Sequence, residues 1–140
     1  MKRIIVLPIL FYFSLLPMSV AAQTLRNSMN ANIGSIQSDG TIRNSNNYTI
    51  GTISSDGTIR DNMNRFVGRI ESNGTVRDGM SRTLGKIESD GTVRDNMNRC
   101  IGKIESNGTV RDSMNRCIGT ARGIRRDWAA VFFFMNLLVK

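Results

Sequence analysis

The sequence contains no histidine, which removes the commonest general base and the commonest metal ligand of proteins. It also has no spacing that pairs a nucleophile with a base, no glycine-rich phosphate loop and no metal-ligand motif. Its acidic residues recur with an internal repeat and therefore share near-identical environments, whereas catalysis needs groups with divergent environments. We therefore expect no enzymatic activity, no catalytic residue, no cofactor and no metal site.

Cysteine is almost absent as well. The only two, Cys100 and Cys117, hold the same position in consecutive copies of the repeat. Thr49, Phe66 and Thr83 fill that position in other copies, so the fold does not need sulfur there. An oxidising compartment permits a disulfide, but a bridge between equivalent positions requires close Cα atoms. A Cys100–Cys117 disulfide and two semi-buried free thiols are both compatible with the sequence.

The N-terminal residues have the three parts of a secretory signal. Lys2 and Arg3 precede an apolar stretch at 4–17, and small residues at 20–22 come directly before Gln23. A membrane anchor, the alternative reading, needs about 20 apolar residues. The sequence predicts a signal peptide at 1–22 and one domain at 23–140, exported to the periplasm, the cell envelope or the medium.

Acidic residues are outnumbered by basic ones, 11 against 19. The excess persists without Lys2 and Arg3, so the exported chain is basic. A basic exported protein is expected to meet an anionic glycan, lipid headgroups or another acidic surface. Export argues against nucleic acid as the partner.

A 17-residue unit fills most of the chain. It is clearest at 84–100, which reads Leu-Gly-Lys-Ile-Glu-Ser-Asp-Gly-Thr-Val-Arg-Asp-Asn-Met-Asn-Arg-Cys. Repeats of this length must be recognised before any other feature is interpreted. Full copies stand in register at 33–49, 50–66, 67–83, 84–100 and 101–117.

Each copy is predicted to form a short β-hairpin. Its Thr-Val or Thr-Ile stretch, bounded by turn residues, is typical of a strand. A three-residue loop ending at Gly91 pairs Ile87 with Val93 and Lys86 with Arg94, which gives one apolar and one polar face. The last loop residue adopts a left-handed conformation, and glycine does so without steric cost.

Two further repeated positions complete the unit. Glycines recur at the second position, on the apolar face, and indicate close approach of the strands to a common axis. Methionines recur at the centre of the second corner, 95–99, and are expected to pack in the core, with a pocket lining as the alternative. These methionines are Met63, Met80, Met97 and Met114.

The two ends of the repeat region complement each other. Residues 24–32 match the second half of a repeat and residues 118–121 match the first half. We predict an all-β closed ring of short β-hairpins, closed by pairing of these N- and C-terminal half repeats, which removes exposed sheet edges. An open solenoid with polar caps is the alternative. Five and six petals are both compatible with this count.

An apolar C-terminal segment at 128–139 follows the repeats. It is too short to span a bilayer as a helix. We expect it to plug the ring, because three consecutive phenylalanines would otherwise be exposed. A patch that touches a membrane or mediates self-association is the alternative.

These features together resemble the secreted five-fold beta-flower proteins of Gram-negative bacteria. The resemblance rests on the signal peptide, the tandem Ile-Gly-x-Ile-x-Ser-Asp-Gly-Thr-(Val/Ile)-x-Asp units and the Trp-Ala-Ala-Val-Phe-Phe-Phe run at 128–134, and it covers 23–134. It implies hairpins arranged as petals around a pseudo-symmetry axis. It carries over no established activity, although a lipid-binding label is sometimes attached to the family.

One basic side chain per copy is the candidate binding residue. On a closed ring these arginines would form a belt of guanidinium groups suited to carboxylate or phosphate. Ordinary ion pairs with Glu71, Glu88 and Glu105 and with the aspartates of the following corners are the alternative. The belt consists of Arg43, Arg60, Arg77, Arg94 and Arg111, with Arg26 from the split copy.

The function predicted from the sequence is that of an exported, non-enzymatic β-repeat protein that binds an anionic glycan or lipid. The alternative is a purely structural or self-assembling envelope protein that uses its apolar C-terminal segment.

Overall fold

The structure is a computed structural model that describes residues 23–139, so the predicted signal peptide at 1–22 lies outside the described residues. Within that range, short strands follow one another without interruption and a single helix comes last. The elements are β1 (Gln23–Asn27), β2 (Asn32–Ile36), β3 (Thr41–Asn44), β4 (Thr49–Ile53), β5 (Thr58–Asp61), β6 (Phe66–Ile70), β7 (Thr75–Asp78), β8 (Thr83–Ile87), β9 (Thr92–Asp95), β10 (Cys100–Ile104), β11 (Thr109–Asp112), β12 (Cys117–Thr120) and α1 (Arg126–Phe134).

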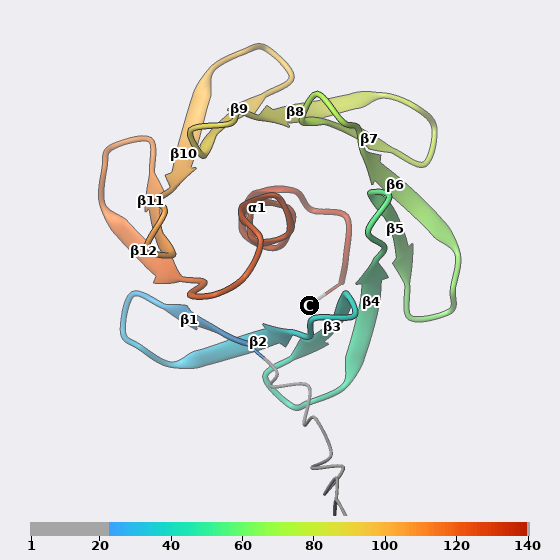
Figure 1. The fold of residues 1–140 in the computed structure, drawn as a ribbon, viewed down its shortest axis with the longest axis horizontal. Coiled ribbons are helices and arrows are strands. Elements are labelled where there is room, and N and C mark those ends of the chain that lie inside the picture. The colour runs from blue at the N-terminus through green and yellow to red at the C-terminus, as the bar shows by residue number, and fades with distance from the viewer. Residues whose placement is uncertain (1–22, 140) are drawn as a thin grey trace, which may run out of the picture.

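The strands form a closed antiparallel barrel in which each strand pairs with its neighbours in sequence (Figure 1). β1 pairs with β12, with Arg26 opposite Thr120 and Asn27 opposite Gly119. This pairing confirms that the two half repeats close the ring. Across residues 23–121 the corners alternate between the two ends of the barrel, and six of them follow odd-numbered strands.

The inner corner, after each even-numbered strand, has the predicted register. Ile87 lies opposite Val93 and Lys86 opposite Arg94. The N–H of Glu88 donates to the carbonyl oxygen of Thr92 at 2.8 Å, so three residues lie between the paired ones. Gly91 has a φ of +90°, in the left-handed region that favours glycine. The three-residue loop is therefore confirmed.

The outer corner, after each odd-numbered strand, also has three residues and is held by a carboxylate. Asp95 Oδ1 accepts the backbone N–H groups of Met97 and Arg99, both at 2.9 Å. Asn98 then turns the chain with a φ of +64°, which asparagine tolerates better than most residues. The predicted core role of the methionines is wrong, because Met97 projects from this corner into solvent. Backbone groups and the Asp95 carboxylate make the hydrogen bonds of this corner, so the methionine side chain contributes nothing to the turn.

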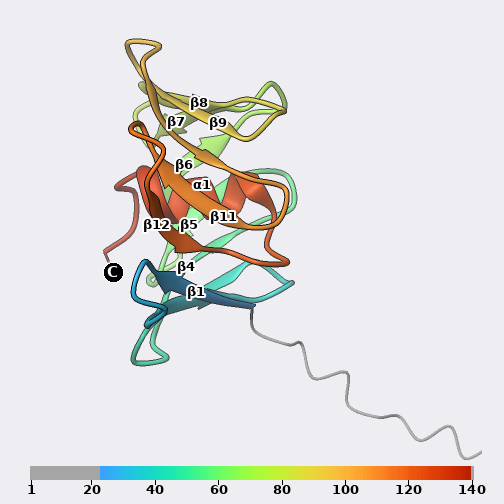
Figure 2. The ribbon, with the colours of Figure 1, turned by 90° about the vertical axis from the view of Figure 1, so that its left-hand side faces the viewer.

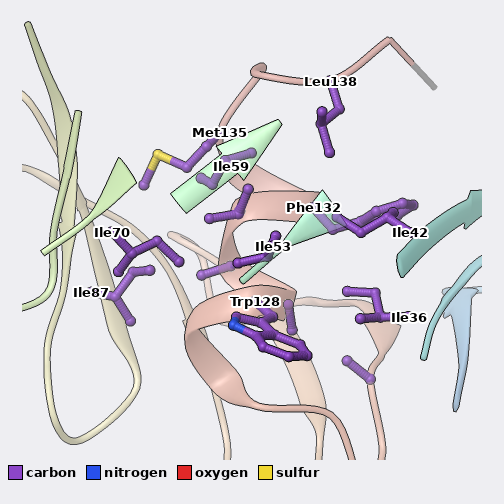
Figure 3. Close-up of a cluster of buried hydrophobic side chains, with 14 of the residues drawn as sticks. Ile36, Ile42, Ile53, Ile59, Ile70, Ile87, Trp128, Phe132, Met135 and Leu138 are labelled. Carbon is purple, nitrogen blue, oxygen red and sulfur yellow. The ribbon is translucent and has the colours of Figure 1, made fainter. Parts of the chain in front are cut away.

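Alternating apolar side chains line the inside of the barrel (Figure 3). Val93 and its equivalents on odd-numbered strands are fully buried, as are most equivalents of Ile87 on even-numbered strands. Side chains on successive strand positions point to opposite faces, so the polar residues between them face outward.

The apolar segment at 128–139 plugs the ring, as predicted, but part of it is helical. α1 lies inside the ring of strands (Figure 1), and Trp128 is only 6% exposed. The predicted fold class is confirmed, because the described chain is a nearly all-β closed ring, and the structure adds one central helix. Burying each large side chain of the plug contributes about 1.5–3 kcal/mol.

The glycines at the second repeat position receive the plug. A Cβ on any of them would meet both the carbonyl oxygen of a neighbouring strand and one side chain of residues 132–138. The closely approaching strands were predicted from these glycines, whereas the plug contact was not. The pairs run once around the ring in sheet order: Gly34 with Phe132, Gly119 with Phe133, Gly102 with Phe134, Gly85 with Met135, Gly68 with Leu137 and Gly51 with Leu138.

The two cysteines are free thiols. Cys100 and Cys117 are both exposed, so the expectation of semi-buried side chains is wrong. Each Sγ lies near a backbone carbonyl oxygen two residues on, at 3.7 Å for Cys100 and 3.6 Å for Cys117. Their repeat position directly follows the outer corner, where the side chain faces solvent.

Candidate functional site

The belt arginines lie on the outer wall of the barrel, where each supports an outer corner. Arg94, half-buried on β9, donates from Nη1 to the carbonyl oxygen of Asn98 at 3.2 Å. Asn98 is the left-handed residue of that corner, so the guanidinium stabilises the turn next to it. The same bond, at 2.9–3.2 Å, is made by Arg26, Arg43, Arg60, Arg77 and Arg111.

Three of these arginines also form the ion pairs expected in the alternative interpretation. Nε of Arg94 donates to Glu88 at 2.8 Å, and this hydrogen bond raises the pKa of the arginine. Arg77 pairs with Glu71 at 2.5 Å, and Arg111 pairs with Glu105 at 2.9 Å. Partly exposed pairs of this kind add little stability, but they neutralise the charge that a ligand would need.

The corner aspartates do not serve the belt. Asp95 instead pairs with Arg99, from Oδ2 to Nε at 2.8 Å. The backbone N–H of Arg99 lowers the pKa of Asp95, so that carboxylate stays ionised. The equivalent aspartates Asp61, Asp78 and Asp112 behave in the same way. The expected pairing of belt arginines with these aspartates is therefore wrong.

The other three belt arginines form no ion pair with a carboxylate within residues 23–139, although the charge of Arg43 helps to lower the pKa of Asp39. They are Arg26, Arg43 and Arg60, on β1, β3 and β5. The repeat position that holds Glu88 next to Arg94 is occupied by Arg122 in the split copy, by Gln37 beside Arg43 and by Ser54 beside Arg60.

Cross-strand neighbours explain this division of the ring. Arg94 lies opposite Lys86, and the other two paired arginines likewise lie opposite Arg69 and Lys103. Two cations placed directly opposite each other repel, and a nearby glutamate offsets that repulsion. Opposite Arg26, Arg43 and Arg60 the second cation is replaced by a hydroxyl residue, so there is no repulsion between cations for a glutamate to offset. These residues are Thr120 opposite Arg26, Ser35 opposite Arg43 and Thr52 opposite Arg60.

A cleft of about 430 Å³ lies at the seam between β1 and β12. It is lined by Thr24, Arg26, Asn30, Thr120 and Arg122, with no acidic residue among them. Two guanidinium groups, two hydroxyls and an amide form a donor set suited to carboxylate, sulfate or phosphate. Sequence reasoning missed Arg122, although its repeat position, which holds glutamate in three other copies, was visible.

Residues 23–139 contain neither a metal-binding cluster nor a membrane-spanning helix. No group of three or more acidic or cysteine side chains is placed to hold a metal ion there. No helix of that part is long and apolar enough to cross a membrane.

A family model described as "5-fold beta-flower protein" matches residues 22–137, which is more than half of the chain. No curated protein and no solved structure matches. The family description names five-fold symmetry, whereas six outer corners are present in residues 23–121, the sixth hairpin unit being completed by the pairing of β1 with β12.

Proposed function

The chain belongs to the 5-fold beta-flower protein family, and from that premise we propose that it is an exported, non-enzymatic protein that binds an anionic glycan. The binding surface is the half of the outer wall that carries Arg26, Arg43 and Arg60, together with Arg122 at the seam. The seam cleft, in which two arginines meet without a carboxylate, is the observation that supports this proposal.

The layout of these arginines favours a polymer over a single small anion. They stand at one repeat position on alternate strands β1, β3 and β5, so they recur at regular intervals along the wall. A glycan with a carboxylate or sulfate on successive sugars presents charges at regular intervals as well. Several weak contacts on one chain add through effective concentration, which compensates for exposed sites that are individually weak.

Arg77, Arg94 and Arg111, which belong to the same predicted site, are assigned a lesser part. Their pairing with Glu71, Glu88 and Glu105 makes the other half of the wall a poorer anion surface. That these three arginines contribute to binding stays a prediction, which the titration experiment described below also tests.

The burial of the apolar segment bears on the alternative function. Trp128, Phe132 and Met135 lie inside the barrel, where they pack against its wall. Self-assembly through this segment would require the plug to leave the ring. This supports a binding role over assembly through the C-terminal segment.

Titration calorimetry with polygalacturonate as the probe tests the proposal. Arg122→Gln removes one exposed charge from the seam, and Lys103→Gln removes one exposed charge from the opposite half of the wall. Loss of a charged contact at the site weakens binding about tenfold, equivalent to about 1.4 kcal/mol. We expect that loss for Arg122→Gln alone, and weaker binding at high salt. Equal affinities for the two variants, or no binding by the unmodified protein, would refute the seam as the site.

Export is tested separately by N-terminal sequencing of protein recovered from the envelope and the medium of expressing cells. We expect the chain to begin at Gln23. Envelope material that still carries Met1 would contradict export through a cleaved signal.

A further inference from the structure

A ring of exposed methionines surrounds one end of the barrel. We call it the methionine crown. Each member is the central residue of an outer corner, and each side chain is 69–83% exposed. The crown consists of Met29, Met63, Met80, Met97 and Met114.

Nothing in the fold requires an apolar side chain at this position. The corner uses only the backbone N–H of Met97, which donates to Asp95. In the copy at 33–49 the position holds Asn46, whose N–H donates to Asn44 Oδ1 at 3.0 Å, and the next residue has the same positive φ as in the other corners. Five large apolar side chains are thus displayed where a polar residue forms the same turn. Repeated exposure of this kind indicates a contact surface.

The crown lies at one end because of the strand topology. Outer corners all follow odd-numbered strands of an antiparallel barrel, so they share one end, which is also where the described chain ends (Figure 2). The inner corners at the opposite end carry Ser-(Asp/Asn)-Gly and expose no large apolar side chain between residues 37 and 108. Asp39, Asp56 and Asp90 lie there, with pKa values lowered by backbone N–H groups of the threonines that follow. The end with the outer corners therefore displays large apolar side chains, whereas the inner corners display polar and acidic ones.

Cationic side chains accompany the crown. An arginine stands two residues after four of its methionines, and each is 70–72% exposed at its side chain. Nε of each bonds to the corner aspartate, as Arg99 does to Asp95. These aspartate side chains are only 13–20% exposed, so the guanidinium is the more exposed charge of each pair, whereas the belt arginines and their glutamates are about equally exposed. Tyr48, 70% exposed, takes this place in the copy that lacks the methionine. The four arginines are Arg65, Arg82, Arg99 and Arg116.

We infer that the methionine crown docks on the surface of a bilayer that contains anionic phospholipids. The crown residues hold one repeat position around a pseudo-symmetric ring, so they lie at equivalent heights and can touch a flat surface together. Their flexible thioether side chains enter the boundary between headgroups and acyl chains, while the neighbouring guanidinium groups meet lipid phosphates. Tyrosine also favours that boundary, which suits Tyr48.

Charge disfavours a second copy of this chain as the occupant. Two crowns placed face to face would bring Arg65, Arg82, Arg99 and Arg116 of one chain against the same residues of the other. Like charges across an interface oppose association. An anionic bilayer complements the same residues.

Vesicle co-sedimentation of the chain from Gln23 onwards, which contains every strand and the plug, tests this inference. The probes are vesicles of phosphatidylcholine alone and of an equimolar mixture with phosphatidylglycerol. The variant replaces the four methionines from 63 to 114 by asparagine, the residue found naturally at position 46. It leaves the net charge unchanged, so it separates apolar docking from charge attraction. Trp128, the only tryptophan and buried, reports through its emission whether the fold is retained.

We expect the unmodified chain to bind the phosphatidylglycerol vesicles, and the four-fold variant to bind them at least about tenfold more weakly with an unchanged melt. Arg122→Gln, at the seam and outside the crown, is expected to bind vesicles like the unmodified chain, so loss of glycan binding and loss of docking are distinguishable. No vesicle binding by the unmodified chain, or equal binding by the variant, would overturn the inference. A dimer that the variant abolishes would also overturn it, in favour of self-association.

Discussion

The contact between Gly102 and the plug offers a sharp test of how this barrel is filled. A Cβ added to Gly102 would lie 2.5 Å from Cε1 of Phe134 and 2.6 Å from the carbonyl oxygen of Arg111. Both distances are well inside van der Waals contact, so something must move. The phenylalanine ring can rotate, but the carbonyl belongs to a strand of the closed barrel and has little freedom.

Gly102→Ala is therefore expected to destabilise the protein. Overpacking of this kind costs about 1–3 kcal/mol, and two opposed clashes place this site near the upper end, at about 2–3 kcal/mol. For a domain of this size, that loss lowers the melting temperature by about 8–12 °C. Gly79→Ala is the matched control, because a Cβ there comes no closer than 3.4 Å to any neighbour. Neither glycine has a positive φ, so the comparison isolates space from backbone strain.

A double-mutant cycle with Phe134→Leu separates the two clashes. A smaller side chain at 134 relieves the clash with the plug and leaves the clash with the carbonyl of Arg111. We expect a favourable coupling of about 1 kcal/mol, measured by thermal or urea unfolding monitored by circular dichroism. Strict additivity, or equal melting temperatures for Gly102→Ala and Gly79→Ala, would refute the pairing of plug side chains with glycines.

Three other predictions address the corners and the plug. Gly91→Val should lower the melting temperature more than Asp90→Asn, since Gly91 has a φ of +90° that a β-branched residue strongly disfavours; equal melts would contradict the three-residue loop. Removal of the chain from Trp128 onwards should give an unstable or aggregating product with β1 loosened, and an unchanged melt in gel-filtered material would defeat the plug. Stability should fall as the pH drops below about 4. The folded-state pKa values of Asp95 and Asp112 lie below their unfolded-state pKa values. Their contribution to stability is therefore fully present above the unfolded-state pKa and is lost as the pH falls through the folded-state pKa. The double variant Asp95→Asn/Asp112→Asn should show a smaller fall in melting temperature between neutral and acidic pH, and an unreduced fall would contradict the role given to these carboxylates.

Much of the barrel was predictable because its information is local. A 17-residue period with a glycine at the end of the inner corner determines where each strand turns. The alternation around Ile87 and Val93 then determines the register, since a shift by one residue would turn every apolar side chain outward. The half repeats at the two ends also predicted closure, because the N-terminal end supplies the second half of a repeat and the C-terminal end supplies the first half.

The candidate binding surface was only half predictable. Spacing alone placed one arginine per hairpin on the outer wall, and the structure has them there. Whether a given arginine is neutralised by a glutamate depends on the residue opposite it on the paired strand and on the residue at the neighbouring inner corner. Arg94 with Glu88 and Lys86 thus differs from Arg26 with Arg122 and Thr120, although both arginines hold one repeat position.

The methionines were wrongly predicted to be buried, because the hydrophobicity of a corner residue does not say whether its side chain points into the core or into solvent. Met97 is apolar and recurs with the repeat, which favours a core role when the sequence is considered alone. In the tertiary structure its corner leads away from a barrel whose interior is already filled by another segment, so the side chain has no apolar surface to cover.

The conformation of that filling segment was also decided by the tertiary structure. A short apolar run such as 128–134 is compatible with strand or helix, and periodicity alone does not distinguish them. The closed barrel settles the choice, because β1 and β12 already pair with each other and leave no edge for a further strand. Inside an apolar ring the backbone N–H and C=O groups of the segment must bond among themselves, and a helix is the structure that does this. The sequence by itself thus determined the ring, and the ring in turn determined that its plug is helical.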